Sequence, residues 1–536
     1  MFKDRLKRGA GLPGGVFFVT ALLFLCASFL RGASIDLPVR EYRLHNGLKL
    51  LVLPRHHVPQ IACQITYLVG SAYEKPGITG ISHFLEHLMF KGTERIGVKD
   101  LEKDRRLRAE LDRTAGRISK LRAQLGEGAL KACLLYEREK KGSAPEGWET
   151  YLALKKLGER MAQLRKEQDQ NIISEELWKR YQQIGGTEMN AQTGYDYTRY
   201  YVKLPAGTEE LFFFLESDRM ENAVFRQFYP EKEVVLQERN QRVDGTPTGR
   251  FYERLQSIFF EAHPYRWPVI GYPEDVRAMR REDLRAHYRR YYRPNNAILT
   301  LVGDIEPDRA LALAERYFGP IQPGPAVERP RIYSVPDLGI KRIEVSAAAQ
   351  SRVIVLFHTP PEGHPDSYAL DLAAGVLDGT VGRLHRRLVL KEKAAIRTAA
   401  WNWTRKFAGE FGVMAFAAPG ADLSRIEELL LEEVQRLAER LPADEELRRS
   451  RLQAEAQFVH ELERLMGSAD LISRAEALTT WRDVERYLGR LEEVTAERVA
   501  AVVKRYLSGE RTVGILKRKE KPSRAAPRPR TAPVGK

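Results

Sequence analysis

One short apolar segment carries three ionisable side chains that an ordinary hydrophobic core does not tolerate. Residues 81–90 read ISHFLEHLMF, with apolar side chains at positions 81, 84, 85 and 88, the spacing of a buried helix face. On such a helix His83 and His87 lie one turn apart and point the same way, and Glu86 lies beside them. Burying this trio is costly unless a metal ion or a partner compensates for it. The pattern therefore predicts that the helix faces a second element that completes a site.

The residue types point to zinc. Two neutral imidazoles on one helix face can hold Zn²⁺ and leave positions for a third ligand and a water. A carboxylate beside that water, here Glu86, can take its proton near neutral pH. A third ligand can come from residues 231–238, where Glu231 and Glu238 share a helix face with two valines. The alternative is that one or both of these carboxylates reach solvent at the helix ends.

Composition excludes several classes of protein. Of the 536 residues, 43% are hydrophobic and 30% charged, which is ordinary for a globular protein. Three cysteines cannot build a disulfide scaffold or a cysteine zinc ribbon. The formal net charge is +15, and residues 517–536 hold eight Lys or Arg against one Glu. We therefore expect a disordered basic tail that is solvated or contacts an anionic surface. A nucleic-acid partner is not expected, because the N-terminal sequence predicts export, which removes most nucleic-acid targets.

The longest apolar run lies at the N-terminus. Residues 1–9 are basic, residues 16–30 are uncharged and apolar, and residues 32–34 are small. This order predicts a secretory signal over residues 1–34 and export, most simply to a bacterial periplasm. The alternative is an uncleaved segment that anchors the protein to the membrane.

The pattern of the remaining chain predicts two mixed halves. The first, residues 35–320, contains apolar strand-like runs, a hairpin turn at Asn46-Gly47, and a highly charged helical stretch at about 101–180. That stretch is expected to be a protruding helical hairpin, either a solvated spacer or a docking arm. A proline-rich linker at 321–337 precedes the second half, residues 338–516, which again begins with strands followed by helices.

Several motifs together resemble one known family. HFLEH is followed by LMFKGT, and further landmarks occur in order: Gly185-Gly186, Asn190-Ala191-Gln192-Thr193, the 231–238 segment, Tyr292-Arg293-Pro294-Asn295-Asn296 and Val302-Gly303-Asp304. This series resembles the insulinase/pitrilysin family of zinc peptidases, whose motif is the inverse of HExxH. The resemblance implies an α+β fold of two related domains, each an antiparallel sheet covered by helices, with the helical hairpin inserted in the first.

The resemblance also implies roles for the site residues. One Zn²⁺ per chain would be held by His83, His87 and Glu238, with Glu86 as the general base and Glu231 as an auxiliary catalytic carboxylate. Asn190 and Ala191 would hold an extended substrate backbone at an exposed strand edge, a mode of binding that demands little of the substrate sequence. The alternative for these two residues is a loop after Gly185-Gly186.

The implied function is zinc-dependent endopeptidase activity on unfolded or short peptides. Members of the resembled family close a chamber from four such domains, and this chain offers two. Its second half has no HxxEH motif, and residues 388–397, after Gly382-Arg383-Leu384, have no Tyr and no Arg in the place where many relatives carry this pair. We therefore expect an inactive repeat and a homologous partner subunit without HxxEH, or else a homodimer. The alternative function is that of a non-catalytic scaffold or assembly subunit. The presence of HxxEH in this chain argues against it.

Overall fold

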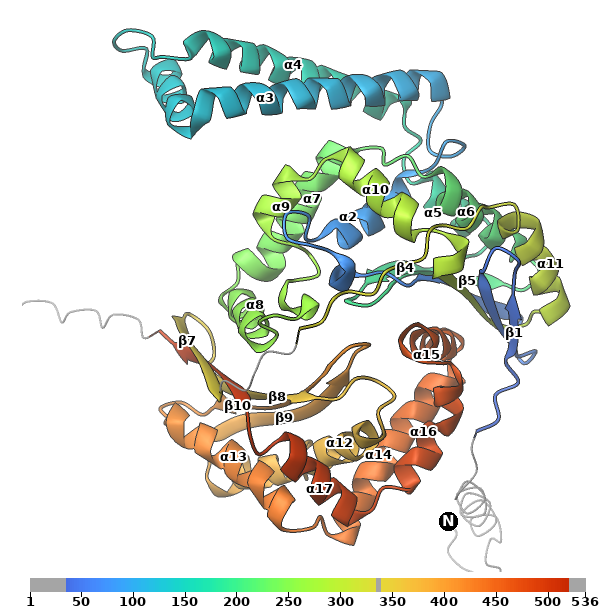
Figure 1. Cartoon of the computed structure of the whole chain (residues 1–536), viewed down its shortest axis with the longest axis vertical. Helices are drawn as coiled ribbons and strands as arrows, with labels where there is room; N and C mark the ends of the chain where they lie inside the picture. Colours follow the sequence, from blue (N-terminus) through green and yellow to red (C-terminus); the bar gives the residue numbers. More distant parts are fainter. Residues whose placement is uncertain (1–34, 334–338, 520–536) are drawn as a thin grey trace, which may run out of the picture.

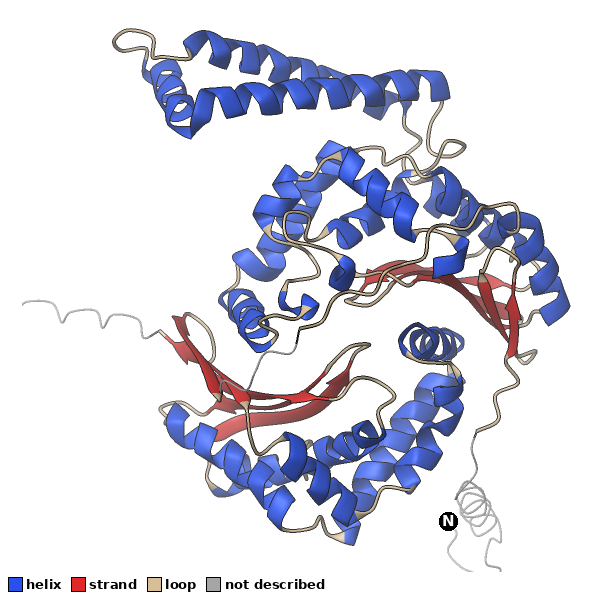
Figure 2. Ribbon diagram, in the orientation of Figure 1, coloured by secondary structure: helices blue, strands red, loops and turns tan. Residues whose placement is uncertain are grey.

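The computed structural model describes residues 35–333 and 339–519, which form two halves with a long helical hairpin on the first (Figures 1 and 2). The expected signal at 1–34 lies outside the described residues, as does the tail from 520 onward. Residues 517 and 518 belong to the last strand, so the expected tail begins later than the charge pattern indicated. No helix within the described ranges is both long and apolar enough to cross a bilayer.

The first half is built on a six-stranded sheet with strand order β1-β2-β6-β3-β5-β4. Its strands are β1 (Arg40–Arg43), β2 (Lys49–Pro54), β3 (Gln60–Tyr67), β4 (Thr187–Thr193), β5 (Thr198–Pro205) and β6 (Ala297–Gly303). Strands β1 and β2 form the predicted hairpin, whose turn places Gly47 at a φ of +90°. All neighbours are antiparallel except β2 and β6, which are parallel.

Helices and strands of the first half share one apolar core. The contributing helices are α2 (Ile81–Leu88), α5 (Glu176–Gln183), α6 (Glu210–Asn222), α7 (Phe228–Arg239), α9 (Pro273–Ala278), α10 (Arg281–Tyr291) and α11 (Pro307–Phe318). Helix α7 begins two residues before Pro230, because proline is tolerated in the first turn of a helix. This layer places α2 directly against α7.

The second half repeats this topology. Its sheet order is β7-β11-β8-β10-β9, and the one parallel pair, β7 with β11, takes the place of β2 with β6. The strands are β7 (Ile340–Ala347), β8 (Arg352–Thr359), β9 (Ala395–Thr404), β10 (Gly409–Ala417) and β11 (Arg511–Arg518). They are covered by α12 (Pro365–Leu377), α13 (Leu423–Glu439), α14 (Asp444–Glu463), α16 (Arg482–Glu492) and α17 (Ala496–Tyr506). The prediction of two related α+β units is confirmed, with one parallel pair in each sheet.

Each half lends a helix to the sheet of the other. Helix α8 (Pro247–Phe259) packs on the second sheet through Phe251 and Leu255, and α15 (Leu465–Leu478) packs on the first sheet through Ala469 and Ile472. In Figure 1, α8 lies above β8 and β10, and α15 lies under the first sheet. The two apolar contacts fix the halves relative to each other.

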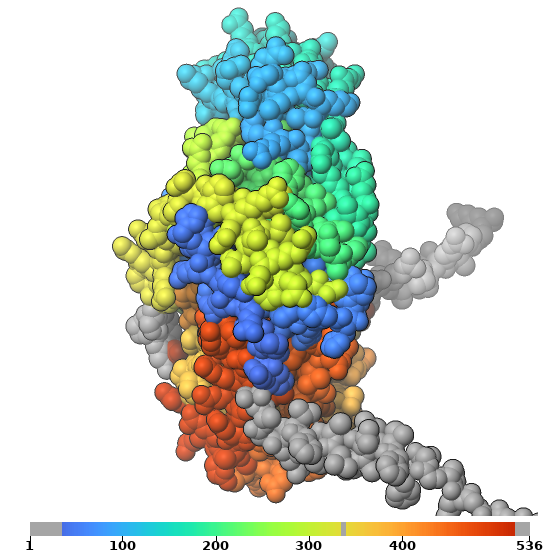
Figure 3. All heavy atoms as spheres, turned by 90° about the vertical axis from the view of Figure 1, so that its right-hand side faces the viewer, coloured from blue at the N-terminus to red at the C-terminus, as the bar shows by residue number. Residues whose placement is uncertain are grey.

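The hairpin consists of α3 (Leu101–Glu139) and α4 (Trp148–Asn171), which form the top of the molecule in the space-filling view (Figure 3). Its ends meet where Lys99 N donates to Asn171 O at 2.9 Å. Helix α5, within the expected insertion, instead buries Leu177 and Tyr181 in the core of the first half. The hairpin proper therefore spans 101–171 rather than 101–180.

The base of the hairpin is docked on the first half by buried charges. Asp104 and Arg226, both fully buried, pair at 3.0 Å, and Asp104 also pairs with Arg108 at 2.8 Å. Asp112 accepts hydrogen bonds from Tyr229 (3.1 Å) and Arg281 (2.9 Å). The base of the hairpin thus packs on the first half as well as on itself. In its distal half, the apolar cluster around Leu125 and Tyr151 contains only residues of α3 and α4 among those described.

This division predicts opposite outcomes for two changes. Replacing residues 118–152 by a short Gly/Ser linker should leave the free energy of unfolding of the first half nearly unchanged, since mainly the distal seam is removed. Asp104→Asn should lower the free energy of unfolding by about 3–5 kcal/mol, because it leaves Arg226 buried without its charge partner. Glu102→Gln, at an exposed ion pair of the same helix, is the matched control and should stay within about 0.5 kcal/mol. Urea denaturation followed by circular dichroism measures all three, and unfolding of the truncated protein would contradict the assignment.

Candidate metal centre

The start of α2 is fixed by a buried carboxylate rather than by a capping side chain of its own. Its N-cap is Gly80, at a φ of +86°, where an added Cβ would lie 2.6 Å from the carbonyl oxygen of Ile270. Glu74 accepts hydrogen bonds from the backbone N–H groups of Gly80 (2.7 Å) and Ser82 (2.8 Å). Burial raises the pKa of Glu74 to about 8, against the effect of these hydrogen bonds. Glu74 thereby satisfies donors that the helix start would otherwise leave unpaired.

Three side chains from α2 and α7 converge beyond this fixed start. The Oε2 atom of Glu238 lies 3.6 Å from Nε2 of His83 and 3.4 Å from Nε2 of His87. One ligand atom from each residue lies within 4.8 Å of the others, and this is the one such cluster among the described residues. Oε2 of Glu238 is buried and accepts no hydrogen bond from the residues that the structure describes, whereas Oε1 pairs with Arg242. Two imidazoles and a buried carboxylate oxygen without a hydrogen-bond donor suit a divalent cation such as zinc.

The protonation of the first imidazole is compatible with this use. Burial, with a further contribution from the charge of His87, lowers the pKa of His83 to about 4. The ring is therefore neutral at physiological pH, the form in which histidine ligates a metal.

Glu231 lies behind His87 rather than at the point of convergence. Its Oε1 is 2.9 Å from Nδ1 of His87, and its Oε2 is 2.7 Å from Nζ of Lys91. Burial lowers the pKa of His87, but the hydrogen bond to Glu231 and the negative charges of Glu231 and Glu238 outweigh it and raise the pKa to about 9. Binding Nδ1 directs Nε2 toward Glu238, as a carboxylate partner orients a metal-bound histidine. The geometry thus gives Glu231 an orienting position.

Glu86 lies next to the cluster but is not part of it. Its Oε2 accepts a hydrogen bond from the hydroxyl of Thr193, the last residue of β4. Burial raises the pKa of Glu86, and the hydrogen bond from Thr193 opposes this rise. A carboxylate with a raised pKa holds a proton more readily near neutrality, as a general base requires.

Asn190 and Ala191 lie in β4, at the edge of the first sheet. They pair with Tyr201 and Tyr200 of β5, and in the described part of the chain β4 has no strand on its other side. The alternative of a loop at these residues is wrong. Asn190 is exposed, and its Oδ1 accepts from the N–H of Ala191 at 2.9 Å.

Four residues that contact site residues or support α2 were not singled out from the sequence: Glu74, Lys91, Thr193 and Arg242. Lys91 and Arg242 each follow a site residue by four positions, a spacing that places them on the same helical side, and Arg242 Nη1 lies 2.7 Å from Oε1 of Glu238. Thr193 closes the segment that begins at Asn190, so its place beside the site could have been proposed. No sequence signal marks Glu74, which acts across a turn.

Comparison with known families agrees with this geometry. The family model described as "Insulinase (Peptidase family M16)" matches residues 51–114, which contain α2, and the one described as "Peptidase M16 inactive domain" matches residues 278–454. The chain belongs to the insulinase (M16) family. Within this M16 protein, the second match begins inside the first half and excludes both α2 and α7.

Individual relatives carry names consistent with the M16 assignment. Zinc protease PqqE of Helicobacter pylori is 24% identical over 465 residues, covering 83% of this chain and 87% of that protein. The crystal structure of a protease from Helicobacter pylori superposes with a TM-score of 0.69 at 22% identity, covering 89% of this chain and 99% of that one. The periplasmic protease PqqL from Escherichia coli gives a TM-score of 0.62 at 16% identity, over 90% of this chain and 48% of that one. The M16 chain is therefore zinc-protease-like.

The cap on α2 predicts a stability effect. Glu74→Ala removes the acceptor of two buried N–H groups and should lower the free energy of unfolding by about 1–3 kcal/mol, with weaker zinc binding because α2 is less well positioned. Glu274→Ala, at an exposed carboxylate on α9, is the control and should change little. Denaturant titration with and without zinc measures both effects. Equal stability of the two variants would show that Glu74 does not support α2.

Proposed function

We propose that this M16 protein is a zinc-dependent endopeptidase that cleaves unfolded or short peptides. The observation that carries the proposal is the convergence of His83, His87 and the unpartnered Oε2 of Glu238. These three residues would hold one zinc ion per chain. Zinc bound there would supply a Lewis acid and lower the pKa of a bound water.

The remaining groups have distinct roles in this proposal. Glu86 takes a proton at its carboxylate and later returns it to the leaving amine, and the Thr193 hydroxyl keeps that carboxylate oriented. Glu231, predicted as an auxiliary catalytic carboxylate, acts instead by orienting His87 through Nδ1. Its link to Lys91 holds its own carboxylate in place.

The edge of β4 provides a place for the substrate backbone. An unpaired strand edge offers N–H and C=O groups with which an extended peptide can form a further strand. Asn190 and Ala191 lie on this edge, in the same strand as Thr193, which contacts Glu86. A peptide bound there would pass close to the general base, and its sequence would matter little because main-chain groups make the contacts.

The setting of the activity completes the proposal. We infer export to a periplasm, which the apolar N-terminal run supports and which agrees with the periplasmic location of the Escherichia coli protease PqqL. We also infer a first unit of 35–320, a linker at 321–337 and a second unit of 338–516 without its own metal centre. A homologous second subunit, or a second copy of the chain, would close the chamber.

One observation favours a different role. The match of residues 278–454 to a model described as an inactive domain is compatible with a non-catalytic scaffold or assembly subunit. The proposed ligands lie outside that match, on α2 and α7. Zinc content and hydrolysis separate the two functions.

The ligand set predicts the metal content of variants. Purified protein should hold about one zinc per chain, and His87→Ala should reduce zinc to background because one imidazole ligand is lost. His57→Ala, which removes an exposed histidine that is not a proposed ligand, should retain the zinc. Atomic absorption gives the stoichiometry, and full zinc in His87→Ala would refute the ligand assignment.

The two carboxylates near His87 should behave differently. Glu86→Gln should keep zinc and lose peptide hydrolysis by at least ~10²-fold, because only the proton acceptor is removed. Glu231→Gln should weaken zinc binding by about 10- to 100-fold, because His87 loses its orienting partner. Competition with a chelator and a fluorogenic peptide assay measure the two effects. If Glu86→Gln released zinc, or Glu231→Gln left its affinity unchanged, the division of roles would be wrong.

The incomplete chamber predicts dependence on a second subunit. We expect the protein to run as a dimer in size-exclusion chromatography with light scattering, and to hydrolyse peptides faster when a co-exported homologous chain is added. Homodimerisation without such a chain is the second expected outcome. Full activity from a strict monomer would refute both and would mean that the second half supplies enough substrate contacts by itself.

A further inference from the structure

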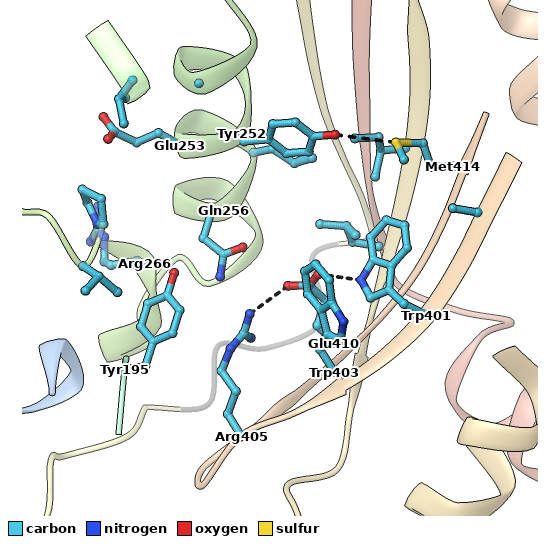
Figure 4. Close-up of a pocket in the computed structure, with 18 of the residues that line it drawn as sticks. Tyr195, Tyr252, Glu253, Gln256, Arg266, Trp401, Trp403, Arg405, Glu410 and Met414 are labelled. Carbon is cyan, nitrogen blue, oxygen red and sulfur yellow. Dashed lines mark hydrogen bonds and ion pairs between the residues drawn. The ribbon is translucent and has the colours of Figure 1, made fainter. Parts of the chain in front are cut away.

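A cavity of about 810 Å³ lies between the two halves, next to α8 (Figure 4). One wall comes from α8 and the loop before it, and the opposite wall from β8, β9 and β10 of the second sheet. It is therefore built by both halves and belongs to neither core.

The wall from the second sheet is aromatic. Trp401 and Trp403 lie two residues apart on β9, and both line the cavity. Trp403 is 57% exposed, which is unusual for tryptophan. Trp401 lies against Gly412, where an added Cβ would be 2.2 Å from its ring, and its Nε1 donates to Glu410 at 3.1 Å. Tyr252 of α8, whose hydroxyl contacts the sulfur of Met414, adds a third aromatic ring to a lining that also includes charged side chains.

Two buried donors in this lining find no hydrogen-bond acceptor within residues 35–333 and 339–519. Nε2 of Gln256 and Nη1 of Arg405 are buried and form no hydrogen bond, and both residues line the cavity. Figure 4 shows their polar ends directed into the space between α8 and the strands. The other guanidinium nitrogen of Arg405, Nη2, lies 3.4 Å from Oε2 of Glu410, so its charge is already balanced. Buried donors without acceptors are costly, so the site is suited to a ligand that brings a neutral acceptor.

Two residues link the cavity wall to the proposed metal centre. Arg242 lines the cavity and also contacts Glu238 through Nη1 at 2.7 Å. Glu253 lines it too and accepts hydrogen bonds from Arg239, the residue after Glu238. These contacts are the ground for treating the cavity and the centre as parts of one substrate-binding surface.

We propose that this cavity is a specificity pocket for an apolar, preferably aromatic, side chain of the peptide substrate. The ring would pack against Trp403 and Tyr252, and a main-chain carbonyl oxygen would accept from Gln256 and Arg405. The inference rests on the proposed peptidase function, and it assigns the second half a part in substrate choice.

The test measures binding rather than turnover. Full-length protein carrying Glu86→Gln is titrated against a labelled, unfolded, C-terminally amidated peptide with a single phenylalanine, and fluorescence anisotropy gives the affinity. Replacing that phenylalanine by aspartate should weaken binding about tenfold, and so should Trp403→Ala or Gln256→Leu in the protein. Trp178→Ala and Gln183→Leu on α5, outside the cavity, are matched controls and should bind as before.

Combining the change in the protein with the change in the peptide gives the sharpest outcome. In Trp403→Ala the preference for phenylalanine over aspartate should largely disappear, because the ring has lost its contact. Unchanged affinity in both cavity variants, equal binding of the two peptides to the parent protein, or a requirement for a free C-terminal carboxylate would overturn the pocket. Zinc content and hydrolysis by the protein without Glu86→Gln are measured in parallel. If the protein neither holds zinc nor hydrolyses peptide but still prefers phenylalanine in a manner that depends on Trp403, the peptidase function alone is refuted. If it hydrolyses peptide and the Trp403 and Gln256 variants do so equally well, the pocket alone is refuted.

Discussion

The architecture of the first half depends on holding four ionisable side chains together between α2 and α7. His83, Glu86, His87 and Glu238 lie in or beside an apolar layer, where unpaired charges are expensive. A cation bound by these side chains would offset the free energy cost of burying them only if α2 and α7 keep their positions relative to each other. Glu74 fixes the start of α2. At the other end, Arg239 ties the end of α7 to Glu253 of α8 and to the carbonyl oxygen of Gly271.

The second half keeps the scaffold without the imidazoles. Helix α12 follows β8 as α2 follows β3, yet beyond Asp366 and Ser367 in its first turn its buried residues are only alanine, leucine and valine. One polar contact has a parallel: Asp371 of α12 accepts from Asn402 of the edge strand β9, as Glu86 accepts from Thr193 of β4. A repeated topology therefore supports two different surfaces, a candidate metal centre on one half and an aromatic wall on the other.

The sequence was most informative where a period of 3.6 residues combined with unusual residue types. That combination predicted α2 and brought Glu231 and Glu238 of α7 toward it, but of the two valines placed on their face only Val235 is buried, and Val234 is exposed. Strand β4 was ambiguous because an exposed edge shows no apolar alternation. Asp104 resembled any solvated helix charge, and only tertiary contact with Arg226 reveals its burial. The shared face of Trp401 and Trp403 could have been predicted from the sequence, because residues two apart on a strand point to the same side of the sheet.

The central claim is that the cluster between α2 and α7 is a zinc site with two imidazole ligands and one carboxylate. X-ray absorption at the zinc edge of the purified protein tests this directly. We expect a first shell of nitrogen and oxygen only, at roughly 2.0–2.2 Å, with the outer-shell scattering of two imidazole rings. A sulfur shell near about 2.3 Å, or the absence of imidazole scattering, would contradict it.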